Sequence, residues 1–193
     1  MQFQTVRGAA IKRYLEAVAR LRIAVFREWP YLYAGSAEYE QGYLRHYAEC
    51  PDSTLVLALD DERVVGASTA LPLAAAEPEF QAPFHARGLD TARYYYLAES
   101  VLQPAYRGYG AGHRFFDARE AVARQLGFEH AAFCAVVRPP DDPRRPADYR
   151  PLDGFWSRRG YARAEGLVCE FSWPDTGAAQ ETYKPLQFWW RRL

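Results

Sequence analysis

The sequence is poor in cysteine and has no net charge. Its three cysteines, Cys50, Cys134 and Cys169, stand far apart, so they fit neither a disulfide framework nor the paired spacing of a zinc site. We therefore expect a reducing cytoplasm. Lysine plus arginine and aspartate plus glutamate both total 24. Without a basic or acidic excess, the chain has no global field to concentrate nucleic acid or an anionic membrane surface, and neither is expected as a partner.

The sequence also has little lysine and no long apolar run. Only Lys12 and Lys184 are lysines among 24 basic residues, a bias that indicates a GC-rich, bacterial genome rather than a chemical role. No stretch approaches the roughly 18 uncharged apolar residues of a membrane span, and Met1 to Ala10 lacks the apolar region of a secretion signal. No histidine shows the spacing of a metal ligand, so no metal is expected.

Length and composition suit one domain over residues 1–193, large enough to bury a core without metal or disulfide support. Apolar residues at three- and four-residue steps predict an amphipathic helix between Gly8 and Trp29, ended by Pro30. A second helix is expected from the N-cap Ser36 to about Glu49.

Strand signals follow the helices. The segments Thr54–Leu59 and Val64–Leu73 flank a short charged turn and predict a hairpin that begins the sheet. A further strand, Tyr94–Leu102, leads through a long helix, Gly110–Leu126, to another strand, His130–Val137. Strand, helix and strand in this order imply a parallel crossover.

The remaining segments are less regular. Ala74–Arg93 is longer than an ordinary connection, and such insertions often border a site. Four prolines among charges make Arg138–Arg150 an exposed loop. Leu152–Arg159 predicts a short helix and Leu167–Trp173 a strand. The aromatic tail, Thr182–Leu193, is expected to dock onto the domain or to form a subunit interface, as in a homodimer.

The most informative stretch is the glycine-rich run Arg107-Gly108-Tyr109-Gly110-Ala111-Gly112 between a strand and the long helix. Glycine lacks a Cβ, so the backbone can take positive φ and turn its N–H groups toward one point. The N-terminal end of the helix dipole adds favourable potential there, and a pyrophosphate fits such a place. The alternative is a tight turn without a ligand.

Two common phosphate motifs do not fit this run. Gly112 is followed by His113 and Arg114, so the Lys-Ser/Thr pair of a Walker A loop is absent. A dinucleotide fingerprint would need glycine at His113 and an acidic residue after a second strand at the spacing that a ribose contact requires, and neither is present. A nucleotide-binding oxidoreductase is therefore disfavoured.

The stretch from Leu102 to Gly112 resembles the acetyl-CoA signature of the GCN5-related N-acetyltransferases (GNAT). That pattern is Arg or Gln, two residues, Gly, one residue, then Gly or Ala, and Arg107, Gly110 and Gly112 fill its positions. Phe155-Trp156-Ser157-Arg158-Arg159-Gly160-Tyr161 resembles the short last helix of the family. The core of the resemblance spans residues 94–161.

The resemblance implies a single-domain α/β fold with a mixed central sheet, flanked by helices and splayed where acetyl-CoA enters. It implies an N-acetyltransferase that moves acetyl to a primary amine of a small molecule or peptide by direct attack in a ternary complex. Main-chain groups from Tyr109 to Gly112 would hold the pyrophosphate, and Leu102 would pair with the pantetheine arm. The coenzyme-binding residues so implied are Leu102, Arg107, Gly108, Tyr109, Gly110, Ala111 and Gly112.

The catalytic residues are less clear from the sequence. An alkyl amine of pKa roughly 10.4 must lose a proton before it attacks, and Glu99, an acid within an apolar strand, is the candidate base. The alternative is an outward-facing strand residue paired with an arginine. Ser100 should face the other side of the sheet. The tyrosine that often acts as the acid in this family falls on Trp156, which is no useful acid, and Tyr161 is a candidate substitute, as are Tyr149 and Tyr31.

The acceptor site is expected in the segment Glu28–Tyr33 and the 74–93 insertion. Trp29, Tyr31 and Tyr33, together with Trp156, are the candidate substrate-binding residues, because aromatic rings suit a flat or cationic acceptor. Packing in the core is the alternative for each ring. A second functional hypothesis, motivated by Trp156, is a non-catalytic acyl-CoA-binding module that senses the coenzyme or supports a partner.

Overall fold

The sheet begins one strand earlier than the sequence predicts. The computed structural model describes residues 1–193, and β1 (Gln2–Arg7) pairs antiparallel with β2 (Thr54–Asp60) at the edge of the sheet. The predicted hairpin of β2 and β3 (Arg63–Pro72) is confirmed, but it does not begin the sheet. Only one residue of β1, Val6, is buried, so the strand carries almost no apolar pattern by which to predict it.

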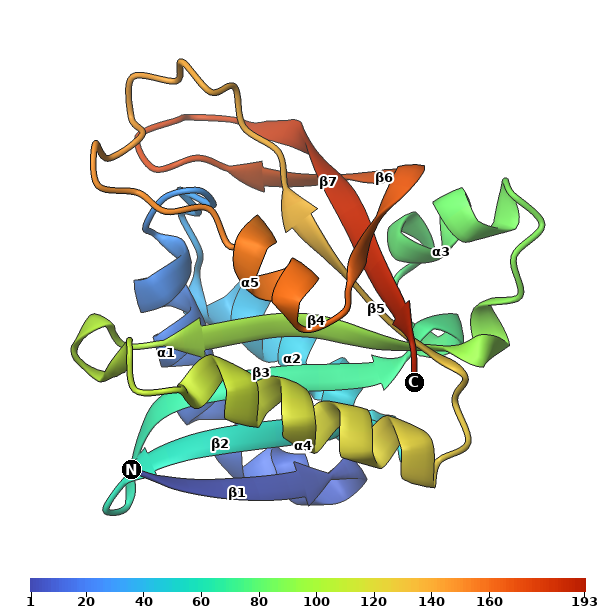
Figure 1. The fold of residues 1–193 in the computed structure, drawn as a ribbon. Helices are drawn as coiled ribbons and strands as arrows, with labels where there is room; N and C mark the ends of the chain where they lie inside the picture. Colours follow the sequence, from blue (N-terminus) through green and yellow to red (C-terminus); the bar gives the residue numbers. More distant parts are fainter.

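Seven strands form one mixed sheet in the order β1-β2-β3-β4-β5-β7-β6 (Figure 1). The strands β4 (Tyr94–Leu102) and β5 (His130–Val136) are parallel and are joined through α4 (Ala111–Gln125), as the sequence predicts. All other neighbouring strands are antiparallel. The fold is a single α/β domain.

The aromatic tail is an inner strand of this sheet. β7 (Glu181–Arg192) lies between β5 and β6 (Ala162–Pro174). Phe188 is fully buried and Trp189 is 7% exposed. Of the two predicted fates of the tail, docking onto its own domain is therefore the one observed.

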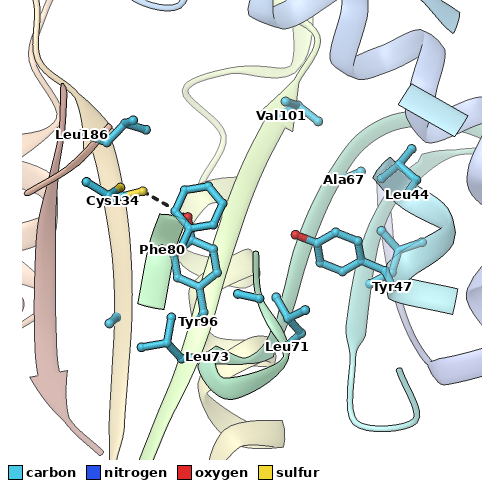
Figure 2. Close-up of a cluster of buried hydrophobic side chains, with 14 of the residues drawn as sticks. Leu44, Tyr47, Ala67, Leu71, Leu73, Phe80, Tyr96, Val101, Cys134 and Leu186 are labelled. Atoms are coloured by element: carbon cyan, nitrogen blue, oxygen red, sulfur yellow. Dashed lines mark hydrogen bonds between the residues drawn. The ribbon is translucent and has the colours of Figure 1, made fainter. Parts of the chain in front are cut away.

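Helices cover both faces of the sheet. The helices α1 (Leu15–Phe26), α2 (Ala37–Glu49) and α3 (Pro78–His85) share one core with one face, while α4 and α5 (Asp153–Arg158) pack on the other (Figure 1). Figure 2 shows part of the first core, where Phe80 of α3 lies beside Tyr96 of β4 and the Tyr96 hydroxyl lies 3.0 Å from Cys134 Sγ. No helix combines the length and apolar character needed to cross a membrane.

Local chemistry explains the helix boundaries. A 3-10 turn, Gly8–Tyr14, precedes α1, so the predicted helix is split, and α1 ends at Phe26 ahead of Pro30. Ser36 caps α2, because its Oγ accepts the N–H of Tyr39 at 3.2 Å. The helix α3 was not predicted, because prolines occupy both its first turn and its interior.

Candidate active site

A cleft opens where β4 and β5 separate. These parallel strands pair only from Tyr94 to Tyr96 with His130 to Ala132. Beyond this point the two strands diverge, and a cavity of about 1370 Å³ lies along the gap. Its walls come from β4, β5, the N-terminal end of α4, α5 and the loops that follow α1 and β5. The splayed sheet predicted from the sequence is thus present.

The glycine turn, residues 107–112, forms one end of this cavity. Gly108 and Gly110 have φ of +86° and +81°, a region that L side chains rarely adopt. Main-chain N–H groups from Tyr109 to Gly112 donate to no acceptor within the protein, and α4 begins at Ala111. Four free donors at a helix N-terminus make a site for an anion such as a diphosphate.

Arg107 ties the glycine turn to its surroundings. Its Nε donates to the carbonyl oxygen of Leu102 at 3.1 Å, and its Nη1 donates to Glu28 Oε2 at 2.8 Å. Arg107, Glu28 and Leu102 all line the cavity. The turn, the end of β4 and the segment after α1 are thereby joined by one side chain.

Glu99 lines the middle of the cavity, and its carboxylate points toward α1 and α2. Arg22 Nη1 lies 2.7 Å from Glu99 Oε1, and the Tyr43 hydroxyl donates to Glu99 Oε2 at 3.4 Å. The arginine pairing of the alternative reading is therefore observed, but Glu99 is buried rather than outward-facing, and it also lines the cavity. Burial, together with the nearby Glu99 carboxylate, raises the pKa of Tyr43 well above its ordinary value, so Tyr43 stays a neutral donor.

Arg22 is itself shared between two acids. Its Nε donates to Glu40 Oε2, and the Glu40 side chain is fully buried. Burial alone would lower the pKa of the Arg22 guanidinium, but the carboxylates of Glu99 and Glu40 outweigh it and raise that pKa. Sequence analysis assigned a role to neither Arg22 nor Glu40. The one available signal was an arginine among the apolar residues on the inner face of α1.

Ser100 faces the opposite side of the sheet from Glu99, as the sequence predicts. Its Oγ accepts a hydrogen bond from Arg119 Nη2 of α4 at 3.0 Å. Arg119 Nη1 donates to the carbonyl oxygens of Thr69 and Glu99, each at 3.1 Å. Thr69 pairs with Glu99 and Leu71 pairs with Tyr96, so two residue steps along β3 face three along β4, and β4 carries one extra residue here. Arg119 therefore binds a carbonyl beside a β4 bulge, a role that the sequence does not indicate.

One part of the cavity wall, here called the aromatic end, contains Trp29, Tyr31 and Tyr149. The rings of Trp29 and Tyr149 meet edge to face with centroids 6.0 Å apart. Arg138 closes the wall behind them, because it donates to the carbonyls of Pro30 at 2.8 Å and Tyr31 at 2.7 Å. The loop after β5 and the segment after α1 thus form one surface.

Two other predicted residues lie in different places. Trp156 of α5 lines the cavity and packs against Phe133 and Trp189, with ring centroids 5.0 and 5.3 Å away. Tyr161 does not line it: the residue is 2% exposed, and its hydroxyl donates to Glu120 Oε1 at 3.0 Å. Burial and the Glu120 carboxylate raise the pKa of Tyr161. The geometry gives no support to the candidate acid Tyr161.

The acceptor segments are also corrected in part. Tyr33 lies outside the cavity, in a smaller pocket beside Tyr39, and burial raises its pKa. No residue of the 74–93 insertion lines the cavity; its helix α3 instead packs Phe80 against Tyr96 and Phe171. The apolar residues of the insertion complete the core behind β6, so the insertion does not wall this cavity, and its part in acceptor binding stays a prediction.

Comparison with known proteins agrees with this geometry. The family model described as acetyltransferase (GNAT) family matches residues 18–147. A ribosomal-protein-alanine N-acetyltransferase from Brucella melitensis is 12% identical, with 100% of both chains covered and a TM-score of 0.65. An N-acetyltransferase from Staphylococcus aureus Mu50 is 9% identical, with 100% of this chain and 99% of that chain covered and a TM-score of 0.63.

A third solved structure, an acyl-CoA N-acyltransferase from Pseudomonas aeruginosa, is 16% identical, with 98% of each chain covered and a TM-score of 0.61. At these identities the likenesses show a shared fold. None of the curated proteins compared with the chain matches it.

Proposed function

Because the chain belongs to the acetyltransferase (GNAT) family, whose members transfer acyl groups from acyl-CoA, we propose that it moves acetyl from acetyl-CoA to a primary amine. Both reactants bind together, and the amine attacks the thioester directly. One observation carries the proposal: Gly110, Ala111 and Gly112 of the glycine turn, whose main-chain N–H groups have no acceptor within the protein, line the same cavity as Glu99.

The coenzyme fits the residues at the turn. A diphosphate needs several donors converging on one point, and the N–H groups from Tyr109 to Gly112 are without protein partners. The gap between β4 and β5 leads from this turn to Glu99. Leu102, at the end of β4, would pair with the pantetheine arm, and a main-chain N–H near it would meet the developing oxyanion.

Glu99 supplies the base. An amine of pKa roughly 10.4 is almost wholly protonated at neutral pH, which costs roughly 4 to 5 kcal/mol as a population term. The ammonium N–H bond breaks, the proton passes to a Glu99 oxygen directly or through water, and the electron pair stays on nitrogen. That pair forms the N–C bond to the acetyl carbonyl as the C–S bond breaks. The sulfur leaves as a thiolate of pKa roughly 8.5 and takes up the second proton of the acylated nitrogen, directly or through water, which gives the neutral amide and the coenzyme A thiol; a dedicated acid is therefore not essential.

The aromatic end is the proposed acceptor pocket. Trp29, Tyr31 and Trp156 line the cavity, and their rings suit a flat or cationic amine. The Brucella relative is a ribosomal-protein-alanine acetyltransferase by its title, so a peptide N-terminus belongs among the acceptors to be tried. Three free cysteines fit a reducing, cytoplasmic setting.

Thiol release with a panel of amines tests the enzyme. The panel contains an aliphatic diamine, 2-phenylethylamine and an alanine-terminated peptide, each with acetyl-CoA. We expect release that depends on at least one amine and that Glu99→Gln strongly reduces. Gly110→Trp should abolish acetyl-CoA binding. The positive φ of Gly110 adds strain of about 1–2 kcal/mol to any side chain there, but a Cβ meets nothing within 4 Å, so the fold should survive, and circular dichroism checks that it does. Unchanged acetyl-CoA affinity in this variant would refute the coenzyme site.

A non-catalytic sensor is the second candidate function. The observation that favours it is Trp156, which lines the cavity. Its indole N–H can donate a hydrogen bond but cannot act as an acid. Tight acetyl-CoA binding without thiol release for any acceptor in the panel would support the sensor over the enzyme.

A further inference from the structure

The Glu99 carboxylate shares its arginine with a second acid that the proposed reaction leaves without a role. Arg22 Nε is hydrogen-bonded to Glu40, whereas Glu99 Oε1 lies 2.7 Å from Arg22 Nη1 without hydrogen-bond geometry. The side chains of Arg22, Glu40 and Glu99 are 9%, 0% and 6% exposed. Water therefore screens their charges little.

We propose that Glu40 is a positioning residue for the proposed base: it takes the directed hydrogen bond of Arg22 and offsets its charge, which leaves Glu99 free to accept the proton of the amine. This inference rests on the proposed function of Glu99. A buried carboxylate beside an unshared guanidinium would be a weaker base, and a weaker base removes a proton more slowly. Glu40 does not line the cavity, so it acts through Arg22.

Other charged and titratable groups also face Glu99. Tyr43 and Tyr47 of α2 are neutral phenols, since burial and the Glu99 carboxylate raise the pKa of each. Arg119 approaches from the other face of the sheet and donates to the Glu99 carbonyl. The remaining groups are Tyr31 after α1 and Glu77 ahead of α3. The test variants change only the charges of Arg22 and Glu40 and leave these groups in place.

Two measurements test this role. Carbon-13 NMR follows the titration of the Glu99 carboxyl, whose resonance is assigned by its loss in Glu99→Gln. The second measurement is the pH dependence of kcat/KM with an amine that the enzyme acetylates. Glu40→Gln should move both midpoints down by about one pH unit or more and reduce kcat roughly three- to tenfold. Arg22→Met should move them up by a similar amount, because two buried carboxylates then face each other. The double variant Arg22→Met/Glu40→Leu should return close to the wild type.

Midpoints that fall in Glu40→Gln and rise in Arg22→Met distinguish this role from structural support. A purely structural role would lower the activity of both variants without these opposite shifts. Glu40→Asp keeps the charge and should keep the wild-type midpoint. Glu120→Gln is the matched control, because Glu120 is also buried and arginine-paired but lies on the opposite face, toward α5. Its midpoints should equal those of the wild type.

Failure of this inference is separable from failure of the proposed function. Equal Glu99 midpoints in the wild type and in Glu40→Gln overturn the inference, whatever the activity. A shifted midpoint without thiol release for any amine overturns the proposed function and leaves the electrostatic role of Glu40 standing. If Glu40→Gln does not fold, Arg22→Met decides alone, and a midpoint that stays or falls overturns the inference.

Discussion

Asp175 joins the loops that wall the aromatic end, and its removal is the sharpest test of how that wall is held. Its carboxylate accepts two hydrogen bonds from Arg138 at 2.9 Å and one from Arg144 at 2.8 Å. Lys184 Nζ lies 3.2 Å away, and Asp175 is only 9% exposed. Arg138 in turn holds the carbonyl of Tyr31. One buried anion thus organises three cations.

Asp175→Asn should destabilise the protein by about 3 kcal/mol at pH 7. The amide keeps the shape of the side chain, but it leaves Arg138 and Lys184 buried without their counter-charge, and breaking a buried pair costs about 3–5 kcal/mol. For a chain of this length, 3 kcal/mol corresponds to a fall in Tm of about 6–12 °C. Urea unfolding and thermal melts measure both quantities. Glu129→Gln, which breaks an exposed pair with Arg93, is the control and should change stability far less.

The pH dependence of this difference identifies its cause. Burial alone would raise the pKa of Asp175, but hydrogen bonds from Arg138, Arg144 and Lys184 outweigh burial and lower it below the ordinary value. A carboxyl whose pKa is depressed by folding stabilises the protein above its unfolded-state pKa, roughly 3.9, and loses this contribution as the pH falls toward the folded-state value. The difference between wild type and Asp175→Asn should stay flat from about pH 7 to 5 and shrink below about pH 4. An equal difference at pH 7 and pH 3, or none at pH 7, would refute the reasoning.

Three further substitutions test the roles of Leu102, Trp156 and Tyr161. Gly66→Ala should cost about 1–3 kcal/mol and weaken acetyl-CoA binding in calorimetry, because its Cβ would lie 2.5 Å from Leu102 Cδ1; unchanged affinity contradicts the role of Leu102. Trp156→Phe should keep kcat within about threefold, since the indole is no acid, and a larger loss in thiol release contradicts this. Tyr161→Phe should lower stability in urea by about 1 kcal/mol, through the lost bond to Glu120, and leave kcat unchanged; a large fall in kcat would restore Tyr161 as the acid.

Much of the fold follows from local sequence signals. The N-cap Ser36, the hairpin before Leu73 and the crossover through α4 were all predicted, because each depends on residues adjacent in the chain. The place of β7 was not predicted, since an aromatic strand carries no information about which neighbours it will pair with. Likewise β1 has one buried residue and α3 contains prolines, so periodicity and propensity both fail there.

The candidate site divides in the same way. The positive φ of Gly110 and the opposite faces of Glu99 and Ser100 follow from short-range geometry, and both are present. The pairing of Glu40 with Arg22 joins two helices, and only packing places those residues together. An arginine within a helix reads as a surface residue until the tertiary structure shows what surrounds it.

Arg119 shows how the two halves of the cavity are connected. It belongs to α4, whose N-terminus offers the free donors of the glycine turn, and it donates to the carbonyl of Glu99 on β4. Burial lowers the pKa of Arg119 to about 10, so it remains charged at neutral pH and its hydrogen bonds are charge-assisted. The helix that would hold the diphosphate is thereby fixed to the strand that carries the proposed base. Because the bond is to a main-chain oxygen beside a bulge, it holds the backbone of Glu99 in place without engaging its carboxylate.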